Sequence, residues 1–154
     1  MGTLDPAFTS LLIDIFTGAA LIKVLVADDH HLVRTSIVRT IELEDGLKVI
    51  AEASDGETAI KLCREHSPDI VLMDIRMPDM DGLEAAAHLD KMENPPAVIF
   101  CTAYEEHALQ AFRVHAVDYL LKPVGAQDLK RALDKARALN RVQIAELSHK
   151  MAAN

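Results

Sequence analysis

The chain has 154 residues, which is the length of one domain with a short terminal segment in addition. Half of its residues are apolar and 26% are charged, so the composition is that of a globular protein with a hydrophobic core and excludes intrinsic disorder. The net charge of −8 argues against direct nucleic acid binding by this segment, because contacts to phosphates require clustered lysine and arginine.

Residues 1–20 differ in pattern from the rest, and we interpret them as a leader or an expression-derived segment. A secretory signal begins with basic residues, whereas the first lysine or arginine here is Lys23, and Asp5 and Asp14 interrupt the apolar stretch. That stretch is also well short of the roughly 20 residues that span a bilayer. We therefore expect no membrane association.

Cys63 and Cys101 are isolated thiols in apolar surroundings, with no ligand-like spacing. This pattern is typical of small core residues, and a metal or disulfide role is the weaker alternative. Free thiols of this kind are usual in reducing compartments, so we expect a cytoplasmic protein.

From residue 21 onward the chain alternates between short apolar runs and segments with apolar residues at helical spacing. The runs have the length of buried strands and are residues 21–27, 47–53, 70–73, 97–101 and 117–121. The helical stripes are Val33, Ile37, Val38 and Ile41, then Ala59, Ile60 and Cys63, then Leu83, Ala86 and Ala87, then Ala108, Leu109 and Phe112, and finally Leu129, Ala132, Leu133 and Ala136. Five β/α units in strict alternation predict an α/β fold, a doubly wound parallel sheet with helices on both faces.

Two pairs of residues predict where helices begin. Ser54 and Glu57 have the spacing of a capping box before the second helix, and Asp81 and Glu84 have it before the third. After about residue 140, the tail of residues 141–154 is expected either to extend the last helix or to begin a linker.

Polar side chains stand at the ends of four of the predicted strands. Asp28 and Asp29 follow the first strand, Asp74 the third, Thr102 the fourth and Lys122 the fifth. Because the carboxyl ends of parallel strands meet at one edge of the sheet, we expect these side chains to share one cleft. Clustered carboxylates repel one another without a cation, and a set of oxygen ligands with no soft donor favours Mg²⁺.

Each of these residues also has a simpler explanation when it is taken alone. Asp28 and Asp29 could form a solvated turn or a helix cap, Asp74 could be a cap, Thr102 could be structural and Lys122 could be an exposed lysine. Their common placement at strand ends favours instead a site in which Asp74 is a nucleophile toward phosphorus.

Four histidines lie among these elements without metal-like pairing, and we interpret them as surface residues: His30, His31, His107 and His115. His30 and His31 lie near the expected cleft and are placed to influence it.

The chain resembles the response-regulator receiver domain of two-component signalling, over about residues 21–140. The matching features are the acidic pair Asp28-Asp29, Asp74 within DIVLMDIRMPDMDG, Thr102, and the pair Lys122-Pro123. The resemblance implies a flavodoxin-like fold with strand order 2-1-3-4-5.

By this resemblance, Asp74 would accept a phosphoryl group from a phosphohistidine of a sensor histidine kinase or from a small phosphodonor. Asp29 and Asp74 would bind Mg²⁺ directly and Asp28 mainly through water. The backbone carbonyl of Arg76 would be the third protein ligand.

The family also implies roles for residues on the fourth and fifth strands. Lys122 would contact the phosphoryl group, and the bond between Lys122 and Pro123 would be cis. Thr102 would also contact the phosphoryl group and would form the conformational switch with Tyr119, for which a half-buried structural aromatic is the alternative.

The resemblance further implies what surrounds the site. The surface of the fourth helix, fifth strand and fifth helix would change on phosphorylation and is a candidate homodimer surface. No enzymatic activity is expected beyond phosphorylation and dephosphorylation of Asp74 itself. In the full-length protein the switch would control transcription through an effector.

The two halves of the chain resemble different kinds of receiver. The segment LIKVLVADDHHLVRTSI is similar to NarL-type receivers, whereas PPAVIFCTAYEEHALQAFRVHAVDYLLKP is similar to LytTR-type receivers such as those of alginate-biosynthesis regulators. A natural intermediate, a reconstruction and a hybrid of the two types are all consistent with this pattern.

Two rival functions make different demands on the same residues. A phosphohydrolase or phosphotransferase with an aspartate nucleophile commonly carries a second acid two residues later, where this chain has Arg76. A flavin-binding module needs a phosphate-cradling loop after the first strand, where this chain has Asp28 and Asp29.

Overall fold

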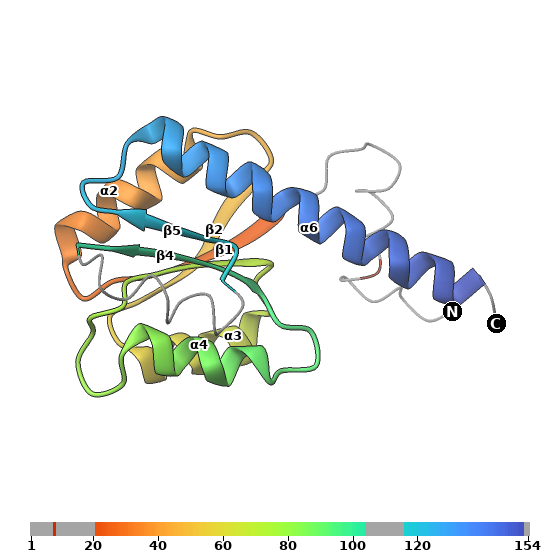
Figure 1. The fold of residues 1–154 in the computed structure, drawn as a ribbon, viewed down its shortest axis with the longest axis horizontal. Helices are drawn as coiled ribbons and strands as arrows, with labels where there is room; N and C mark the ends of the chain where they lie inside the picture. Colours follow the sequence, from red (N-terminus) through yellow and green to blue (C-terminus); the bar gives the residue numbers. More distant parts are fainter. Residues whose placement is uncertain (1–7, 9–20, 104–115, 153–154) are drawn as a thin grey trace, which may run out of the picture.

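The computed structural model describes residue 8, residues 21–103 and residues 116–152, with side chains described as far as residue 140. Five parallel strands form one sheet, and they are β1 Ile22–Ala27, β2 Leu47–Ala53, β3 Ile70–Met73, β4 Ala97–Thr102 and β5 Asp118–Leu121. Their order is β2-β1-β3-β4-β5, which confirms the predicted doubly wound sheet. The carboxyl ends of the strands lie at one edge, on the left in Figure 1.

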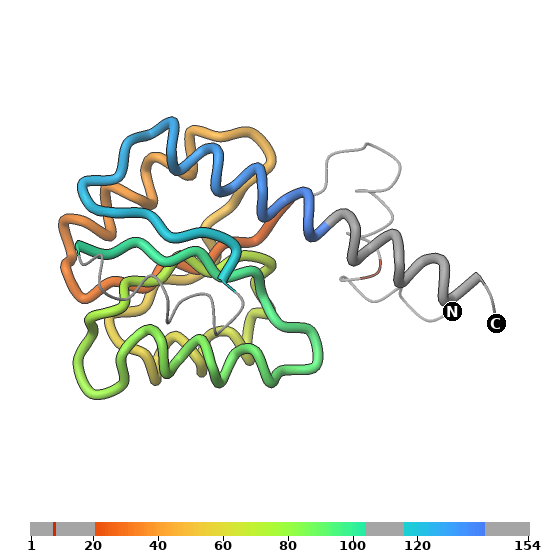
Figure 2. The backbone as a smooth tube through the Cα atoms, viewed as in Figure 1, coloured from red at the N-terminus to blue at the C-terminus, as the bar shows by residue number. Residues whose placement is uncertain are grey.

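Helices cover both faces of this sheet. The described helices are α2 His31–Glu42, α3 Gly56–His66, α4 Gly82–Asp90 and α6 Ala126–Ala152. Figure 1 shows α2 and α6 on one face and α3 and α4 on the other, and the backbone trace in Figure 2 shows the same two layers. The predicted helix with Ala108, Leu109 and Phe112 lies outside the described residues.

The strands divide their side chains between two apolar clusters, one under each helical layer. Along β1, Leu25 and Ala27 join the cluster under α3 and α4, whereas Val24 and Val26 join the one under α2 and α6. This alternation buries both faces of the central strands, as their uninterrupted apolar runs predict.

The last helix packs through the stripe predicted for it. Leu129, Ala132, Leu133 and Ala136 are all buried in the cluster beneath α2 and α6. The helix then continues as far as Ala152, so residues 141–152 are helical. Among the described residues, no helix has both the length and the hydropathy needed to cross a bilayer.

One of the two predicted helix starts is wrong by one residue. Asp55, and not Ser54, caps α3: its carboxylate accepts the backbone N–H of Thr58 at 2.7 Å and the Thr58 hydroxyl at 3.0 Å. A carboxylate beside a helix N-terminus interacts more favourably with the helix dipole than a serine hydroxyl does. The predicted cap of α4 is confirmed, since Asp81 accepts the N–H of Glu84 at 2.8 Å.

Candidate functional site

The site begins where β1 and β3 end side by side. These strands pair in parallel with Ala27 opposite Met73, so the residues that follow, Asp28 and Asp74, leave the sheet as neighbours. The backbone N–H of Asp74 continues the ladder by donating to the carbonyl of Ala27 at 2.9 Å. The sheet register therefore brings two carboxylates together from positions 46 residues apart in the chain.

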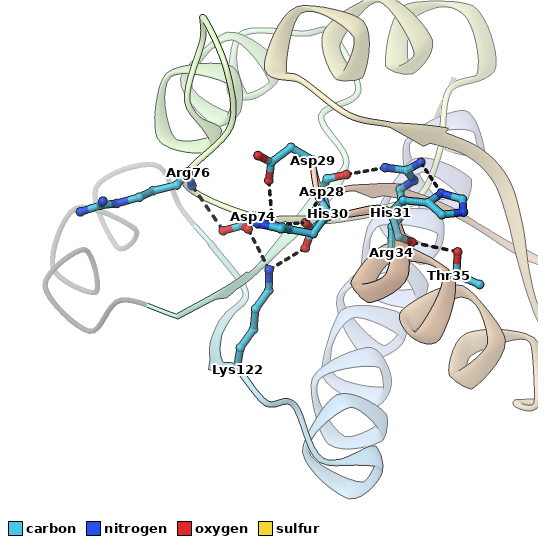
Figure 3. A network of polar contacts seen from close by, with 9 residues as sticks. All are labelled: Asp28, Asp29, His30, His31, Arg34, Thr35, Asp74, Arg76 and Lys122. Atoms are coloured by element: carbon cyan, nitrogen blue, oxygen red, sulfur yellow. Dashed lines mark hydrogen bonds and ion pairs between the residues drawn. The ribbon is translucent and has the colours of Figure 1, made fainter.

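Lys122 holds these two carboxylates together from the end of β5. Its Nζ lies 2.7 Å from Oδ2 of Asp28 and 2.8 Å from Oδ2 of Asp74, as Figure 3 shows. Asp28 is 1% exposed and Asp74 is 5% exposed, so both charges are almost entirely removed from water. Buried carboxylates require such a partner, because the desolvation of an unpaired charge is costly.

The two carboxylates determine the protonation of Lys122. Burial by itself lowers the pKa of an ammonium group, but here the hydrogen bonds and negative charges of Asp28 and Asp74 outweigh it. The pKa of Lys122 is therefore raised above its usual value of 10.5. Lys122 is a permanent positive charge in this cleft at neutral pH.

Asp29 and His30 complete the cluster on its solvent side. The Asp29 side chain is 30% exposed, and its Oδ1 lies 3.1 Å from Nδ1 of His30. The same nitrogen lies 3.5 Å from Oδ1 of Asp28. Of the four predicted surface histidines, His30 and His31 are exposed, and His107 and His115 lie outside the described residues. Figure 3 shows that His30, and not His31, turns its ring toward the acids.

Backbone groups hold the two buried carboxylates in place. The N–H of His30 donates to Oδ1 of Asp28 at 2.9 Å, and the N–H of Arg76 donates to Oδ1 of Asp74 at 3.3 Å. Neither acid caps a helix, because α2 follows His30 and α4 is capped by Asp81. The cap interpretations of these acids are thereby excluded.

Arg34 is a further member of the site that the sequence patterns did not identify. From α2 its guanidinium donates to the backbone carbonyl of Asp28 at 2.6 Å and to Oε1 of Glu52 at 3.1 Å. It thus ties the acidic turn to the edge strand β2. The available signal was its place in the first turn of α2, where a long side chain reaches back toward the residues before the helix.

The donor atoms of this cluster are suited to a divalent cation. One ligand atom from each of Asp28, Asp29, His30 and Asp74 can be chosen so that all four lie within 4.8 Å of one another. Three of the four are carboxylate oxygens, which hard cations prefer. The residues present therefore fit a metal ion, with Lys122 at the inner side of the cluster.

Thr102 and Lys122 are linked through the backbone at the ends of β4 and β5. The N–H of Lys122 donates to the carbonyl of Thr102 at 2.8 Å. Thr102 is fully buried, and its hydroxyl has no hydrogen-bond partner in the described part of the chain. A buried hydroxyl without a partner is unusual, and such an atom is often completed by a ligand.

Two further predicted residues are Tyr119, which lies on β5, and Pro123, which follows that strand. The peptide bond between Lys122 and Pro123 is cis. Tyr119 is half-buried and packs against the cluster beneath α3 and α4. This position agrees with a structural aromatic, and its predicted role in a switch remains a prediction.

The loop from Ile75 to Asp81 connects the site to α4 and closes tightly. The N–H of Gly82 donates to the carbonyl of Ile75 at 2.7 Å. A Cβ on Gly82 would overlap the carbonyl oxygen of Asp74, so only glycine fits there.

Comparison with known proteins identifies a family and relatives to which this chain is similar. The family model of the response regulator receiver domain matches residues 24–134 of this chain. The positive alginate biosynthesis regulatory protein of Pseudomonas aeruginosa is 53% identical over 127 residues, which are 82% of this chain and 51% of that protein. The sensory transduction protein LytT of Bacillus anthracis is 41% identical over 124 residues, which are 80% of this chain and 50% of that protein.

A solved structure agrees with these relatives. The signal receiver domain of the response regulator NarL from Mycobacterium tuberculosis is 36% identical, with a TM-score of 0.72, and the match covers 77% of this chain and 98% of that one. The relatives thus include both types of receiver to which the two halves of the sequence are similar. The chain spans about half the length of the curated relatives it matches. With its sheet order and its acidic cleft in agreement, the chain belongs to the family of response regulator receiver domains of two-component signalling.

Proposed function

We propose that Asp74 accepts a phosphoryl group from a phosphohistidine of a sensor histidine kinase, or from a small phosphodonor such as acetyl phosphate. A carboxylate oxygen of Asp74 attacks phosphorus, the bond from phosphorus to the donor breaks, and an acyl phosphate forms on Asp74. The observation that carries this proposal is the contact of 2.8 Å between the buried Asp74 carboxylate and Lys122 Nζ. It supports a site with cationic charge already positioned where a phosphoryl group would gather negative charge.

Mg²⁺ is the cofactor we propose for this step. Asp29 and Asp74 would hold it directly, Asp28 would act through water, and the backbone carbonyl of Arg76 would be the third protein ligand. When bound, the ion neutralises the charge of the transferring group and orients its oxygens. The clustered carboxylates support a hard divalent cation.

Lys122 and Thr102 would recognise the transferred group. The Lys122 ammonium can leave one carboxylate and bind a phosphoryl oxygen without a change of its own charge. The unpartnered Thr102 hydroxyl can donate to another phosphoryl oxygen, which would draw the end of β4 toward Asp74. Tyr119 on the neighbouring strand would then move between two positions and pass the change to the surface.

The same proposal extends to partners and output. The surface made by residues 104–115, β5 and α6 would carry the change to an effector and is the candidate homodimer surface; residues 104–115 lie outside the described part. The chain would act in the cytoplasm, without enzymatic turnover of a separate substrate. In a longer protein it would regulate transcription, as the name of the transcriptional regulatory protein LytR of Staphylococcus aureus indicates for that protein.

The alternative function for the same nucleophile is that of a phosphohydrolase of related fold. The position two residues after Asp74 holds Arg76, which is exposed and contributes its backbone N–H to Asp74. No acid is present there to activate water or a leaving group, which favours a stable phosphoprotein over turnover.

Intact mass spectrometry after incubation with acetyl phosphate and Mg²⁺ tests the proposal. The unaltered chain should gain about 80 Da, the mass of one phosphoryl group, and the gain should be acid-labile. Asp74→Asn should remove the gain and leave the circular dichroism spectrum unchanged. The matched control is Asp79→Asn, an exposed aspartate of the same loop with φ of 65°, a conformation that asparagine adopts readily.

Labelling of the Asp74→Asn variant to the same extent as the unaltered chain would refute the assignment. Continuous release of inorganic phosphate in excess of the protein would instead identify a hydrolase. The Asp79→Asn control should label as the unaltered chain does.

A further inference from the structure

We propose that His30 is an additional metal ligand of the acidic cluster, used by borderline transition-metal ions such as Co²⁺ and Ni²⁺ and not by Mg²⁺. The inference deepens the proposed function, because it concerns the same cation site. It assigns to that site a second class of ion and names the side chain responsible.

The distance from His30 to Asp29 is that of two neighbouring ligands on one ion. Neighbouring ligands of an octahedral ion with bonds of about 2.1 Å are about 3.0 Å apart. Nδ1 of His30 lies 3.1 Å from Oδ1 of Asp29 and 3.5 Å from Oδ1 of Asp28. A single ion can therefore be bound by the imidazole and these carboxylates with small adjustments.

The backbone of His30 is already fixed relative to the acids. Its N–H donates to Oδ1 of Asp28 at 2.9 Å, so the main chain that carries the ring is anchored on the cluster itself. The side chain is 68% exposed, which leaves the ring accessible to an ion arriving from solution. Figure 3 shows the ring turned toward Asp29 and the buried acids.

The adjacent histidine has a different environment and supplies a control. Nδ1 of His31 lies 3.3 Å from a guanidinium nitrogen of Arg34, and Figure 3 shows its ring on the other side of the turn. Two histidines next to each other in the sequence are therefore unequal: one faces three carboxylates and the other a cation.

Ligand chemistry separates the two classes of ion. Imidazole binds Co²⁺, Ni²⁺ and Zn²⁺ well, whereas Mg²⁺ takes oxygen ligands and retains several waters. A site with three carboxylates alone discriminates weakly among divalent ions. The nitrogen of His30 should raise the affinity for the transition-metal ions and leave that for Mg²⁺ unchanged.

Isothermal titration of the untagged chain with CoCl₂, NiCl₂ and MgCl₂ at about pH 8 tests this assignment, since metal ligands bind in their deprotonated forms. His30→Gln should weaken Co²⁺ and Ni²⁺ binding by about ten-fold or more and change Mg²⁺ binding by less than about two-fold. His31→Gln should leave all three affinities unchanged. Asp29→Asn should weaken all three, which assigns the measured heat to this cluster and not to the other histidines.

The visible absorption of bound Co²⁺ gives a second measurement, since loss of a nitrogen ligand changes its intensity and maximum. Unchanged Co²⁺ and Ni²⁺ affinity and spectra in His30→Gln would overturn the inference. An equal loss for all three ions would overturn it too, because it would indicate a structural role.

The two proposals can fail separately. If Asp74 is labelled while His30→Gln binds Co²⁺ normally, only the role of His30 is refuted. If His30 determines Co²⁺ affinity while Asp74 is never labelled, the phosphoryl-accepting function is refuted and the metal site is still supported.

Discussion

At the scale of single residues, the ion pairs between Lys122 and two carboxylates hold the cleft together. One ammonium group serves two buried acids, Asp28 and Asp74, which are 94 and 48 residues away in the chain. Removal of one partner of a buried ion pair is costly, because the remaining charge has neither water nor a counter-charge.

Lys122→Met should therefore lower the free energy of unfolding by roughly 3 kcal/mol in EDTA, measured by urea denaturation. Addition of Mg²⁺ should restore part of the loss, since the ion would supply the missing positive charge. Lys130→Met, at an exposed position of α6, is the control and should change stability little in either buffer. Equal stability of Lys122→Met and the unaltered chain in EDTA would contradict the role of this ion pair.

The raised pKa of Lys122 gives this contribution a definite pH range. A group whose pKa is higher in the folded state stabilises fully below its unfolded value, here 10.5, and loses that contribution as pH rises through the folded value. The difference in unfolding free energy between the unaltered chain and Lys122→Met should thus be constant from about pH 6 to about pH 9 and shrink only above 10.5. A decrease near neutral pH would contradict the direction of the shift.

Arg34 acts on the acids through the backbone and is a positioning residue. Arg34→Met should reduce Mg²⁺ affinity by about ten-fold, because the turn that carries Asp28 loses its tie to Glu52. Arg34→Lys should recover only part of the affinity, since an ammonium lacks the fork that reaches both acceptors. Arg39→Met removes the same charge from an exposed position of α2 and should leave the Mg²⁺ titration unchanged.

At the scale of elements, the connection between β3 and α4 decides how the nucleophile is presented. Gly82 begins α4 and lies against the carbonyl of Asp74, so the first turn of the helix sits directly behind the site. Any side chain at this position must push the loop and the end of β3 apart.

Gly82→Ala should destabilise the fold by roughly 2–4 kcal/mol in urea denaturation and slow the labelling of Asp74. Gly125→Ala is the matched control. A Cβ there would meet only Asp128 Oδ2, at an ordinary contact distance of 3.6 Å. That variant should stay within about 0.5 kcal/mol of the unaltered chain. Equal stability of the two variants would mean that the loop can shift to accommodate a Cβ at Gly82 at little cost in free energy.

At the scale of the whole molecule, the sheet separates two apolar clusters, one beneath each helical layer, and each cluster contains one free thiol. Cys63 belongs to the cluster beneath α3 and α4, and Cys101 to the one beneath α2 and α6. Burial raises the pKa of each thiol from 9.0 to about 12, so neither forms an appreciable thiolate at neutral pH.

Both thiols should consequently resist a thiol reagent such as DTNB at about pH 8 in the folded protein and react fully in concentrated guanidinium chloride. At intermediate denaturant, peptide mapping should find the two labelled together if the layers unfold as one cooperative unit. Early reaction of Cys101 alone would show that the layer of α2 and α6 opens independently.

Much of this protein was determined by local sequence. The strands and the buried stripe of α6 follow from the pattern of apolar residues, and the cap at Asp81 follows from its spacing to Glu84, so local sequence predicts all of them. The convergence of Asp28, Asp74 and Lys122 at one edge also follows from sequence, because parallel strands share a direction.

Only the tertiary structure decided how the polar atoms pair. The sharing of Lys122 between two acids, the tie from Arg34 to Glu52 and the approach of His30 to Asp29 depend on side-chain directions and on strand register. The choice of Asp55 over Ser54 as a cap is a smaller case, since both residues suit the role and the path of the chain after β2 selects one. Contacts between residues that are distant in the chain, or between equally suitable neighbours, leave no periodic pattern in a sequence, because they arise only when packing brings the atoms together.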